Sequence, residues 1–300
     1  MSRESEPKII IDDEESVSEE TTKTHRETER EEEERKFQNV IVKRVDESLR
    51  HPDDILERTI EEGEEQLRRS FLSLLISSAA ASMILCFTVM AVAIATGITK
   101  DMSEASARLL VAAVYPLGFI LTILSGTQLF TEHTATAVYP VLDKRSDYGA
   151  LLRLWGIVIL GNLIGALIGA SFLVAADNVI KAKESYIAIG HHLVDISAFD
   201  LLISSLLAGW LMALGAWLLR SSSNTVAQIL CIFIVTFLIG LGGLHHSIAG
   251  SVEIFAASMI GDDFTATDIF RFIGLALGGN LIGGSIFVGA LNYTHIRRTQ

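Results

Sequence analysis

Long apolar segments alternate with short polar connections along most of the chain, and the alternation starts near residue 70. There are six such segments, and each is long enough to cross a hydrocarbon core, which needs about 20 helical residues. They lie near residues 70–98, 106–142, 150–176, 199–219, 224–260 and 268–293. The pattern predicts an all-α membrane protein whose six transmembrane helices form one domain over residues 70–296.

The second and fifth segments are too long for one plain crossing, and each is interrupted by small and polar residues. The interruptions consist of Ser125, Gly126, Thr127 and Gln128 in the second segment and of Gly242, Gly243, Leu244, His245, His246 and Ser247 in the fifth. Glycine weakens a helix, and an ionisable side chain at bilayer depth is costly. We therefore expect each of these two segments to be a half-helix, a loop and a second half-helix.

A five-residue motif in the third segment recurs letter for letter in the sixth, 118 residues later. Its small and polar positions are Gly161, Asn162 and Gly165 in the first copy and Gly279, Asn280 and Gly283 in the second. The two breaks are separated similarly, since Leu129 and Leu244 are 115 residues apart. Residues 70–176 and 199–293 thus look like two three-helix repeats, the second inverted in an aquaporin-like manner. The alternative to a repeat is that the motif recurs by chance, or because small residues four apart are common where membrane helices pack closely.

The residues before the first span are strongly acidic. The chain has a formal charge of −12, and residues 1–69 carry 13 Lys and Arg against 23 Asp and Glu, which is −10 of that total. We expect residues 1–51 to be a disordered tail, because they cannot bury enough apolar surface to fold. Residues 52–69 place apolar side chains at helical spacing, which predicts an amphipathic helix at the membrane surface. The acidic excess argues against a nucleic-acid partner.

Charge and hydropathy also bear on orientation in the bilayer. No apolar segment precedes residue 70, so we expect no cleaved signal peptide. Basic residues near the predicted span ends number eight on the side of the termini and five on the other. This asymmetry favours a multi-pass protein of the inner or plasma membrane with both termini in the cytoplasm.

The two breaks are the candidate sites of chemistry. Unpaired backbone N–H groups at the start of a half-helix carry partial positive charge, which suits an anion. Here these starts lie at Phe130 and Thr131 and at His246 and Ser247. A histidine suits proton transfer near neutral pH, so His246 is a candidate donor to an entering anion. The resulting neutral acid can cross apolar constrictions that exclude its anion.

Each of these polar residues also has a structural interpretation. Thr131 can cap the second half-helix, and His246 and His245 can tie the ends of the loop together by hydrogen bonds. His133 fits a loop or packing role. Outside the breaks, the sequence favours a structural ion pair near the cytoplasmic end for Glu253 and a solvated loop between spans for His191 and His192.

These motifs resemble the formate/nitrite transporter family over residues 52–296. The stretch from Pro116 to Phe119 followed by Gly126 to Thr131 looks like the first broken helix of that family, and Gly243 to Ala249 looks like the second. The resemblance implies an aquaporin-like arrangement of six spans, a homopentamer and one pore in each protomer. It implies that His246 is the central histidine with Thr131 as its partner. The implied pore constrictions are Tyr115, Phe119, Leu129, Phe130 and Ile239.

The chain departs from that family at three positions beside the breaks. Well-studied members usually have Glu immediately before the central histidine and Asn four residues after it, where this chain has His245 and Gly250. The Asn that commonly follows Thr131 by two residues is His133. A lysine that studied formate channels carry before the fourth span has no counterpart between Gly190 and Phe199.

We therefore predict a channel or proton-coupled transporter for small monovalent weak-acid anions such as formate or nitrite, with no enzymatic activity, cofactor or metal. His246, Thr131 and His245 would form the substrate and proton relay. Two alternatives stay open. One is a neutral-solute pore of the aquaporin type, which shares inverted repeats and half-helices. The other is an intramembrane metal enzyme, whose candidate ligands are His133, His245, His246 and Glu132.

Overall fold

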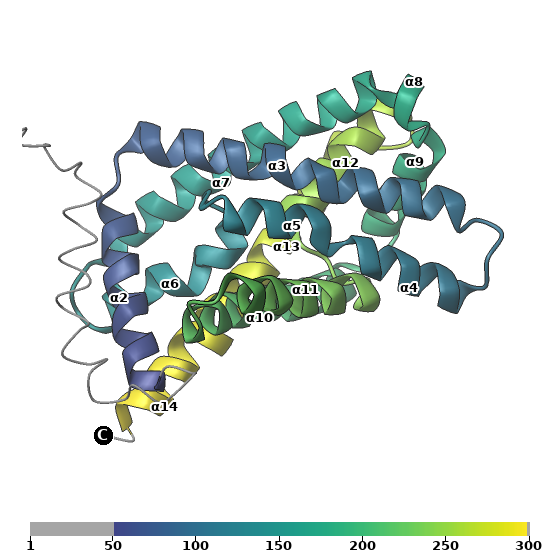
Figure 1. The fold of residues 1–300 in the computed structure, drawn as a ribbon. Helices are drawn as coiled ribbons and strands as arrows, with labels where there is room; N and C mark the ends of the chain where they lie inside the picture. Colours follow the sequence, from purple (N-terminus) through teal and green to yellow (C-terminus); the bar gives the residue numbers. More distant parts are fainter. Residues whose placement is uncertain (1–50, 299–300) are drawn as a thin grey trace, which may run out of the picture. The chain divides into compact units, whose positions relative to one another are not determined.

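Residues 51–298 are the part of the chain that the computed structural model describes, and they are helical apart from short turns. Within this range there is no strand. The predicted acidic tail, except for His51, lies outside it. The described helices are α2 (Pro52–Arg68), α3 (Phe71–Ile98), α4 (Glu104–Val114), α5 (Pro116–Leu124), α6 (Phe130–Leu142), α7 (Tyr148–Ala175), α8 (Asp177–Ile180), α9 (Lys183–Val194), α10 (Ala198–Ser221), α11 (Thr225–Gly242), α12 (Ser247–Ile260), α13 (Ala266–Ile282), a π-helix (Gly283–Ala290) and α14 (Leu291–Arg298) (Figure 1).

Six helical stretches are long and apolar enough to cross a membrane. They are Phe71–Ile98, Glu104–Leu124, Tyr148–Ala175, Ala198–Ser221, Thr225–Gly242 and Ala266–Arg297. Each begins after a Ser, Thr, Asp or Asn whose side chain accepts a backbone N–H three residues along, and these caps are Ser70, Ser103, Asp147, Ser197, Asn224 and Thr265. Such caps satisfy N–H groups that a helix start leaves without a partner. The sequence thereby fixes where each crossing begins.

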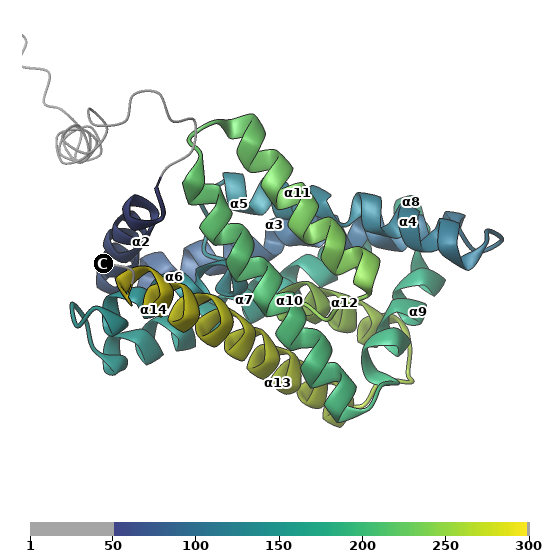
Figure 2. The same ribbon diagram turned by 90° about the horizontal axis from the view of Figure 1, so that it is seen from below.

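The spanning helices run between two ends of this part of the molecule. Helix α2 and α14 lie at one end, which we call the α2 end, while α4, α8 and α9 lie at the other, the α9 end (Figures 1 and 2). The outer faces of the helices carry exposed large apolar side chains, for example Leu152 and Phe172 on α7 and Leu230 on α11. Such faces suit lipid or a neighbouring protomer rather than water.

Two helix breaks interrupt the second and fifth crossings. Helix α5 ends at Leu124 and α6 begins at Phe130, while α11 ends at Gly242 and α12 begins at Ser247. A glycine with positive φ turns the chain at each break, with φ +68° at Gly126 and +60° at Gly243. Side chains other than glycine rarely adopt this conformation, so these two glycines make the turns possible.

The two breaks have the same backbone geometry. The residue before the new half-helix has φ −95° and ψ 122° at Leu129 and φ −94° and ψ 120° at His246. Leu129 of the first break therefore corresponds to His246 of the second, 117 residues later. The sequence spacing pairs Leu129 with Leu244 at an offset of 115 residues, and this pairing is wrong by two residues. In the structure, the positive-φ glycines and the half-helix starts of the two breaks correspond at an offset of 117 residues.

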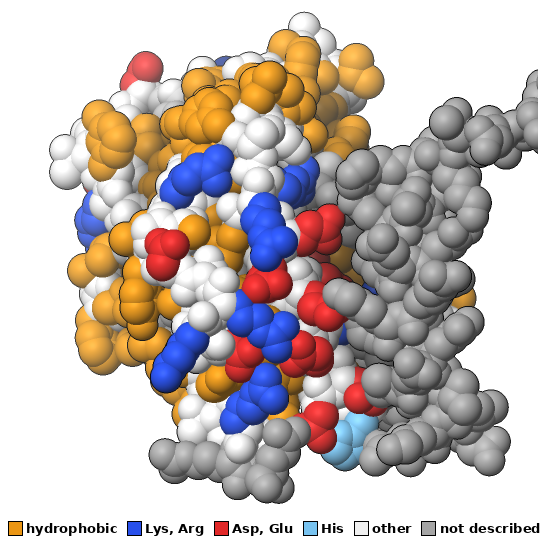
Figure 3. Space-filling view, turned by 90° about the vertical axis from the view of Figure 1, so that its left-hand side faces the viewer, with side chains coloured by type: hydrophobic (Ala, Val, Ile, Leu, Met, Phe, Trp, Pro, Cys, Tyr) orange, Lys and Arg blue, Asp and Glu red, His pale blue; other side chains and the backbone are white. Residues whose placement is uncertain are grey.

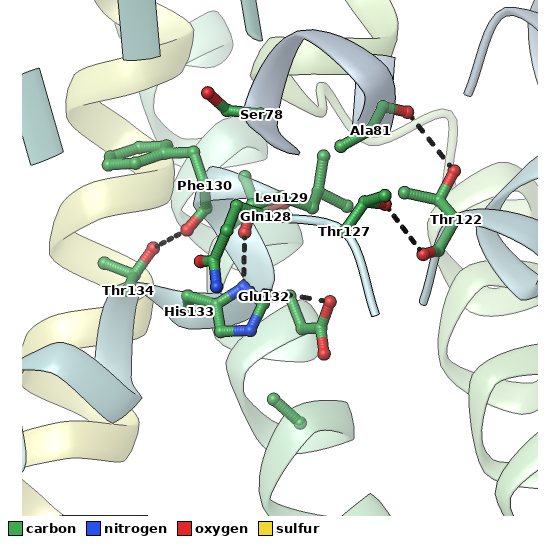
Figure 4. A network of polar contacts seen from close by, with 12 residues as sticks. Ser78, Ala81, Thr122, Thr127, Gln128, Leu129, Phe130, Glu132, His133 and Thr134 are labelled. Carbon is green, nitrogen blue, oxygen red and sulfur yellow. Dashed lines mark hydrogen bonds and ion pairs between the residues drawn. The ribbon is translucent and has the colours of Figure 1, made fainter. Parts of the chain in front are cut away.

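A buried asparagine anchors each break in the same way. The amide oxygen of Asn162 accepts the N–H of Phe130 at 2.9 Å, and its amide nitrogen donates to the carbonyl oxygens of Ser78 at 2.7 Å and Gln128 at 3.0 Å. Figure 4 shows Gln128 and Phe130 of the first break with Ser78 of α3 above them.

In the second repeat, Asn280 makes the equivalent bonds. Its oxygen accepts the N–H of Ser247 at 2.8 Å, and its nitrogen donates to the carbonyl oxygens of Ser205 at 2.6 Å and His245 at 3.1 Å. Two backbone groups of each break thus find partners inside an apolar environment, where an unpaired group would be costly, and a third bond joins the asparagine to the neighbouring helix α3 or α10.

Glycines beside each asparagine allow the helices to approach closely. A Cβ atom at Gly165 would overlap the carbonyl oxygen of Ala79, and one at Gly283 would overlap the carbonyl oxygen of Leu206. The pairs α3 with α7 and α10 with α13 therefore pack through the same small-residue device in both repeats.

Candidate functional site at the two helix breaks

The two breaks meet at one polar contact in the interior. Thr131 Oγ1, on the first turn of α6, lies 2.6 Å from Nε2 of His246, the residue before α12. Their exposed fractions are 0% and 2%. One partner comes from each repeat, so the contact lies where the two half-helix starts face each other.

Hydrogen bonding assigns the protons of His246. Its Nδ1 accepts the backbone N–H of Ala249 at 3.1 Å, and a backbone N–H can only donate. In the neutral ring the proton therefore sits on Nε2, which donates to the Thr131 hydroxyl oxygen. The hydroxyl hydrogen of Thr131 is then available to a further acceptor. This arrangement differs from the structural expectation for Thr131, because its hydroxyl bonds His246 rather than capping α6.

The start of each half-helix is less open than the sequence indicated. The first N–H of α6 is bonded to Asn162 and the first N–H of α12 to Asn280. His246 occupies the N–H of Ala249 as well. The N–H groups of Phe130 and Ser247 are therefore engaged by the two asparagines, which leaves fewer open N–H groups at each start than expected, and the Thr131 hydroxyl and the His246 imidazole are the side-chain polar groups of the centre.

Aromatic rings stand directly beside the central histidine. The ring of Phe119 lies 5.0 Å from that of His246 at 84°, and the ring of Tyr115 lies 5.2 Å from that of Phe119. Leu129, Phe130 and Ile239 belong to the same buried apolar cluster. Phe119 thus contacts the central histidine, and all five residues that the family resemblance implied as pore constrictions belong to one buried apolar cluster.

A cavity of about 500 Å³ reaches this centre from the α9 end. Residues from α4, α9, α11 and the second break line it, among them Tyr115, Ile239, His245 and His246. A second cavity of about 380 Å³ lies at the α2 end and is lined by Gly126 of the first break together with other residues. We call them the α9-end cavity and the α2-end cavity.

The α2-end cavity contains a buried carboxylate beside the first break. Glu132 lines it, is 7% exposed, and has one carboxylate oxygen without a hydrogen-bond partner. Nδ1 of His133 lies 3.9 Å from that oxygen and bonds the carbonyl oxygen of Leu129 at 3.1 Å. Figure 4 shows both side chains below Leu129. His133 thus ties the first turn of α6 together, which agrees with a packing role.

At the α9 end, His192 and Glu253 differ from expectation. Residues Lys183–Val194 form helix α9 rather than a loop, and the ring of His192 stacks on that of His245 with centroids 5.4 Å apart. Glu253 lies on α12, lines the α9-end cavity, and makes no hydrogen bond or ion pair within the described residues. The connection expected as a loop is therefore a helix, although the exposed side chain of His192 agrees with a solvated position, and the expectation of a structural ion pair for Glu253 is wrong. Sequence spacing did not reveal either placement, because the residues meet across separate helices.

The structure also explains the glycine four residues after the central histidine. A Cβ atom at Gly250 would overlap Cζ of Phe272 on α13. The Phe272 ring is fully buried and lies 6.2 Å from the ring of His245. An apolar ring therefore occupies the space that a side chain at position 250 would need.

The outer surface of the α2 end carries a network of ion pairs. Figure 3 shows basic and acidic side chains together in the middle of this face, with apolar side chains above and to their left. Arg145 contacts Glu57 at 2.5 Å and Asp143 at 2.8 Å, and Arg297 contacts Asp143 at 3.0 Å. Burial raises the pKa of Asp143, but the hydrogen bond from Tyr293 and the charge of Arg297 outweigh it and lower that pKa overall.

Helix α2 is attached to the spanning helices by a second ionic contact. Arg220, near the end of α10, donates to Glu62 of α2 at 2.7 Å. Burial raises the pKa of Glu62, but the charges and hydrogen bonds of Arg220 and Arg58 outweigh it and lower that pKa overall. Both carboxylates are therefore held in their charged forms.

No metal site is formed by the described residues. Within residues 51–298, no group of three His, Cys, Asp or Glu side chains is arranged to hold a metal ion. The four ligands considered from the sequence are divided instead, since Glu132 lines the α2-end cavity while His245 and His246 line the α9-end cavity.

Comparison with known proteins gives relatives that share this fold. A family model for formate/nitrite transporters matches residues 53–294. The inner membrane protein YfdC of Escherichia coli (strain K12) is 33% identical over 248 residues, covering 81% of this chain and 78% of that protein. An FNT family ion channel superposes with a TM-score of 0.73 at 21% identity, over 81% of this chain and 99% of that one. A pentameric formate channel with formate bound superposes with a TM-score of 0.65 at 19% identity, over 76% and 98%.

These similarities agree with the six apolar helices, and together they mark a multi-pass membrane protein. The matching family consists of transporters and channels rather than enzymes. The family model spans most of the described residues, including both helix breaks and both anchoring asparagines. The chain belongs to the formate/nitrite transporter family.

Proposed function

We propose that this protein is a channel or proton-coupled transporter for small monovalent weak-acid anions such as formate or nitrite. The observation that carries the proposal is the 2.6 Å contact between Thr131 and His246, buried where two half-helices meet. Family membership supports it, and so does the structural relative described as a pentameric formate channel with formate bound.

The proposed mechanism begins with an anion in the α9-end cavity. The hydroxyl of Thr131 donates to the anion, because its oxygen already accepts from His246. An anion beside an imidazole favours the charged form of the ring. The charged ring carries a proton on Nδ1 and cannot accept the N–H of Ala249. Protonation therefore breaks the hydrogen bond by which His246 caps α12. Donation of the Nε2 proton through the Thr131 hydroxyl converts the anion into its neutral acid and leaves a neutral ring with its proton on Nδ1. The bond from Ala249 re-forms once Nε2 takes a proton from solvent and Nδ1 releases its own.

The neutral acid then passes the apolar constrictions. Phe119 and Leu129 are fully buried beside the central pair and offer no charged partner to an anion. Moving an unpaired carboxylate into such surroundings is far costlier than moving a neutral acid. The constrictions therefore select the protonated form, which loses its proton again in the α2-end cavity.

The proposal includes the assembly and the orientation of the chain. We propose a homopentamer with one pore in each protomer, which is supported by the pentameric relative and by the exposed apolar faces of the spanning helices. We also propose that the α2 end and both termini face the cytoplasm. The excess of basic residues near the span ends on that side supports this orientation.

The function is tested by flux assays on purified protein in liposomes. Formate, nitrite, acetate and hydrosulfide are presented one at a time between about pH 5 and 7, the range in which histidine titrates. We expect saturable flux of at least one of them above protein-free liposomes. Absence of flux for all four, in liposomes whose protein retains its oligomeric state, would reject the proposal. Water permeability measured by stopped flow separates it from an aquaporin-like pore.

A further inference from the structure

His245 is buried beside the central histidine, yet one of its nitrogens has no partner. The side chain is 3% exposed and lines the α9-end cavity. Its Nε2 makes no hydrogen bond, although the main-chain carbonyl of His192 lies nearby. A polar group left unpaired in the interior is costly unless something else uses it. The cavity that His245 lines is the space from which a ligand can reach this residue.

Ser204 on α10 determines which nitrogen of His245 carries the proton. The Ser204 hydroxyl oxygen lies 2.7 Å from Nδ1 and accepts the backbone N–H of His245 at 3.1 Å. No other acceptor for the Ser204 hydroxyl hydrogen is present among the described residues. The hydroxyl therefore donates to Nδ1, and the neutral ring carries its proton on Nε2. Among the described residues, the nearby acceptor for this donor, the main-chain carbonyl of His192, lies outside hydrogen-bonding geometry.

His192 connects this donor to the outside of the protein. Its ring stacks on that of His245 at an interplanar angle of 17°, and its side chain is exposed. The Nε2 atom of His192 lies 3.6 Å from where a Cβ of Gly243 would be, so the ring sits over the second break. The exposed ring of His192 therefore lies between solvent and the buried ring of His245.

The α9-end cavity contains few other charged groups. Helix α4 contributes Glu104 and Arg108, α12 contributes Glu253, and the Tyr115 hydroxyl and His246 complete the titratable set. Arg108 is engaged by the carbonyl oxygen of Leu241 at 2.7 Å. The lining residues from α3 and α11 are uncharged, and so are those from α9 apart from His192. Among the described lining residues, Arg108 is the one with a fixed positive charge.

We propose that His245 and His192 form a second anion-binding site, which holds the weak-acid anion in the α9-end cavity before it reaches Thr131 and His246. The site rests on the proposed transport function and refines it. The Nε2–H of His245 donates a hydrogen bond to the anion, and the exposed ring of His192, stacked on that of His245, lines the approach to it.

The test compares His245→Asn and His192→Asn with the unmodified protein in liposomes. Asparagine at 245 can still accept from Ser204 but cannot carry a proton. We expect either substitution to raise the KM for formate by about tenfold at pH 5.5, as the loss of a charge-assisted hydrogen bond predicts. Because Thr131 and His246 are unchanged in both variants, the pH dependence of flux attributed to His246 should remain.

His191→Asn is the matched control. His191 neighbours His192 on α9, but its ring contacts Asp195 at 3.0 Å and Phe264, outside the cavity. The His191→Asn variant should leave the KM for formate and the pH dependence of flux unchanged. Unchanged KM in His245→Asn, with flux retained, would overturn the proposal, and so would an equal rise of KM in His191→Asn.

A binding readout separates this inference from the proposed function. NMR of histidine-labelled protein in detergent follows the ring signals of His245 and His192 during a formate titration, with sodium chloride as the reference anion. We expect both signals to shift at pH 5.5 in the unmodified pentamer and the His192 signal to stop responding in His245→Asn. If no flux is found but these signals respond to formate, the transport function fails while the site stands. If flux is found and the signals do not respond, the site is rejected alone.

Discussion

His246 has two hydrogen-bond partners that place opposite demands on its ring. Ala249 requires Nδ1 to accept, whereas Thr131 receives the proton of Nε2. The capping interaction therefore stabilises the neutral ring, and the charged ring exists only while the cap is broken. This coupling gives the histidine a structural role and a proposed proton-transfer role at the same time. The two interpretations that the sequence left open for this residue are thus compatible.

Gly250 and Phe272 provide a test of packing beside the site. In Gly250→Ala, the new methyl group would overlap Cζ of the buried Phe272 ring. We expect a loss of about 1–3 kcal/mol of stability, as is usual for overpacked interiors. Thermal unfolding of the purified protein in detergent measures it.

The control for this substitution is Gly274→Ala on α13, where an added Cβ has open space within the protomer. It should leave the melting temperature within about a degree of the original, because unstrained surface changes are usually within ±0.5 kcal/mol. Phe272→Leu lacks the Cζ atom and should reduce the penalty of Gly250→Ala when the two are combined. A melting temperature that is unchanged in Gly250→Ala would contradict the packing described.

At the level of helices, the two anchoring asparagines make equivalent bonds to the two breaks. Asn162→Leu and Asn280→Leu would each leave one N–H and two carbonyl groups without their partner. An unpaired polar group in a membrane interior costs several kcal/mol. We expect both variants to lose thermal stability by a similar amount and to lose flux. Size-exclusion chromatography after heating measures the first effect.

The comparison of the two variants matters more than either one alone. Similar losses follow from the matched geometry of Leu129 and His246. If one of the two substitutions left thermal stability unchanged while the other lowered it, the two breaks would not be equivalent. Gly156→Ala, on the same helix as Asn162 but with open space at its Cβ, serves as the control for substitution in a spanning helix.

The spans, the breaks and the repeat were predictable from the sequence because they depend on local composition. Apolar length identifies a span, and Gly126, Gly243 and His246 stand out within apolar runs. The register between the repeats was not predictable, because it depends on loop geometry, and so Leu129 was paired with Leu244 instead of His246. The π-helix at Gly283–Ala290 and helix α9 were also missed, since neither has a distinct hydropathy pattern.

The side-chain pairings across helices were the least predictable part of the site. The stacking of His192 on His245 and the filling of the Gly250 position by Phe272 join residues 53 and 22 positions apart. No spacing rule connects such residues before the helices are placed. The predicted contact of Thr131 with His246 came from the family resemblance, not from composition or periodicity.

At the scale of the whole molecule, ion pairs between charged side chains hold α2 against the spanning helices. Glu62 and Asp143 have pKa values below their ordinary 4.5 and 3.8, so each stabilises the folded state above the pKa of the unfolded chain. That stabilisation is lost as pH falls through the lower folded value. Between pH 5 and 7 both carboxylates stay charged and the ion pairs persist.

We therefore expect hydrogen exchange in α2 to be constant from about pH 7 to pH 5, after correction for intrinsic rates, and to rise only below about pH 4. In Arg220→Gln the protection of α2 should already be reduced at pH 7, because Glu62 loses its charged partner. Loss of α2 protection between pH 7 and pH 5 would contradict this assignment. It would also mean that transport in that range does not report on histidines alone.

The most direct test measures formate and proton fluxes together in liposomes, for the unmodified protein and for His246→Asn. Asparagine can still accept the N–H of Ala249 but cannot ionise, so the fold is retained while proton transfer is removed. We predict that the unmodified protein moves about one proton with each formate and that His246→Asn loses at least about tenfold in flux at pH 5–6, with its pH dependence abolished. Unchanged coupling and pH dependence in His246→Asn would contradict the proposed role of the central histidine.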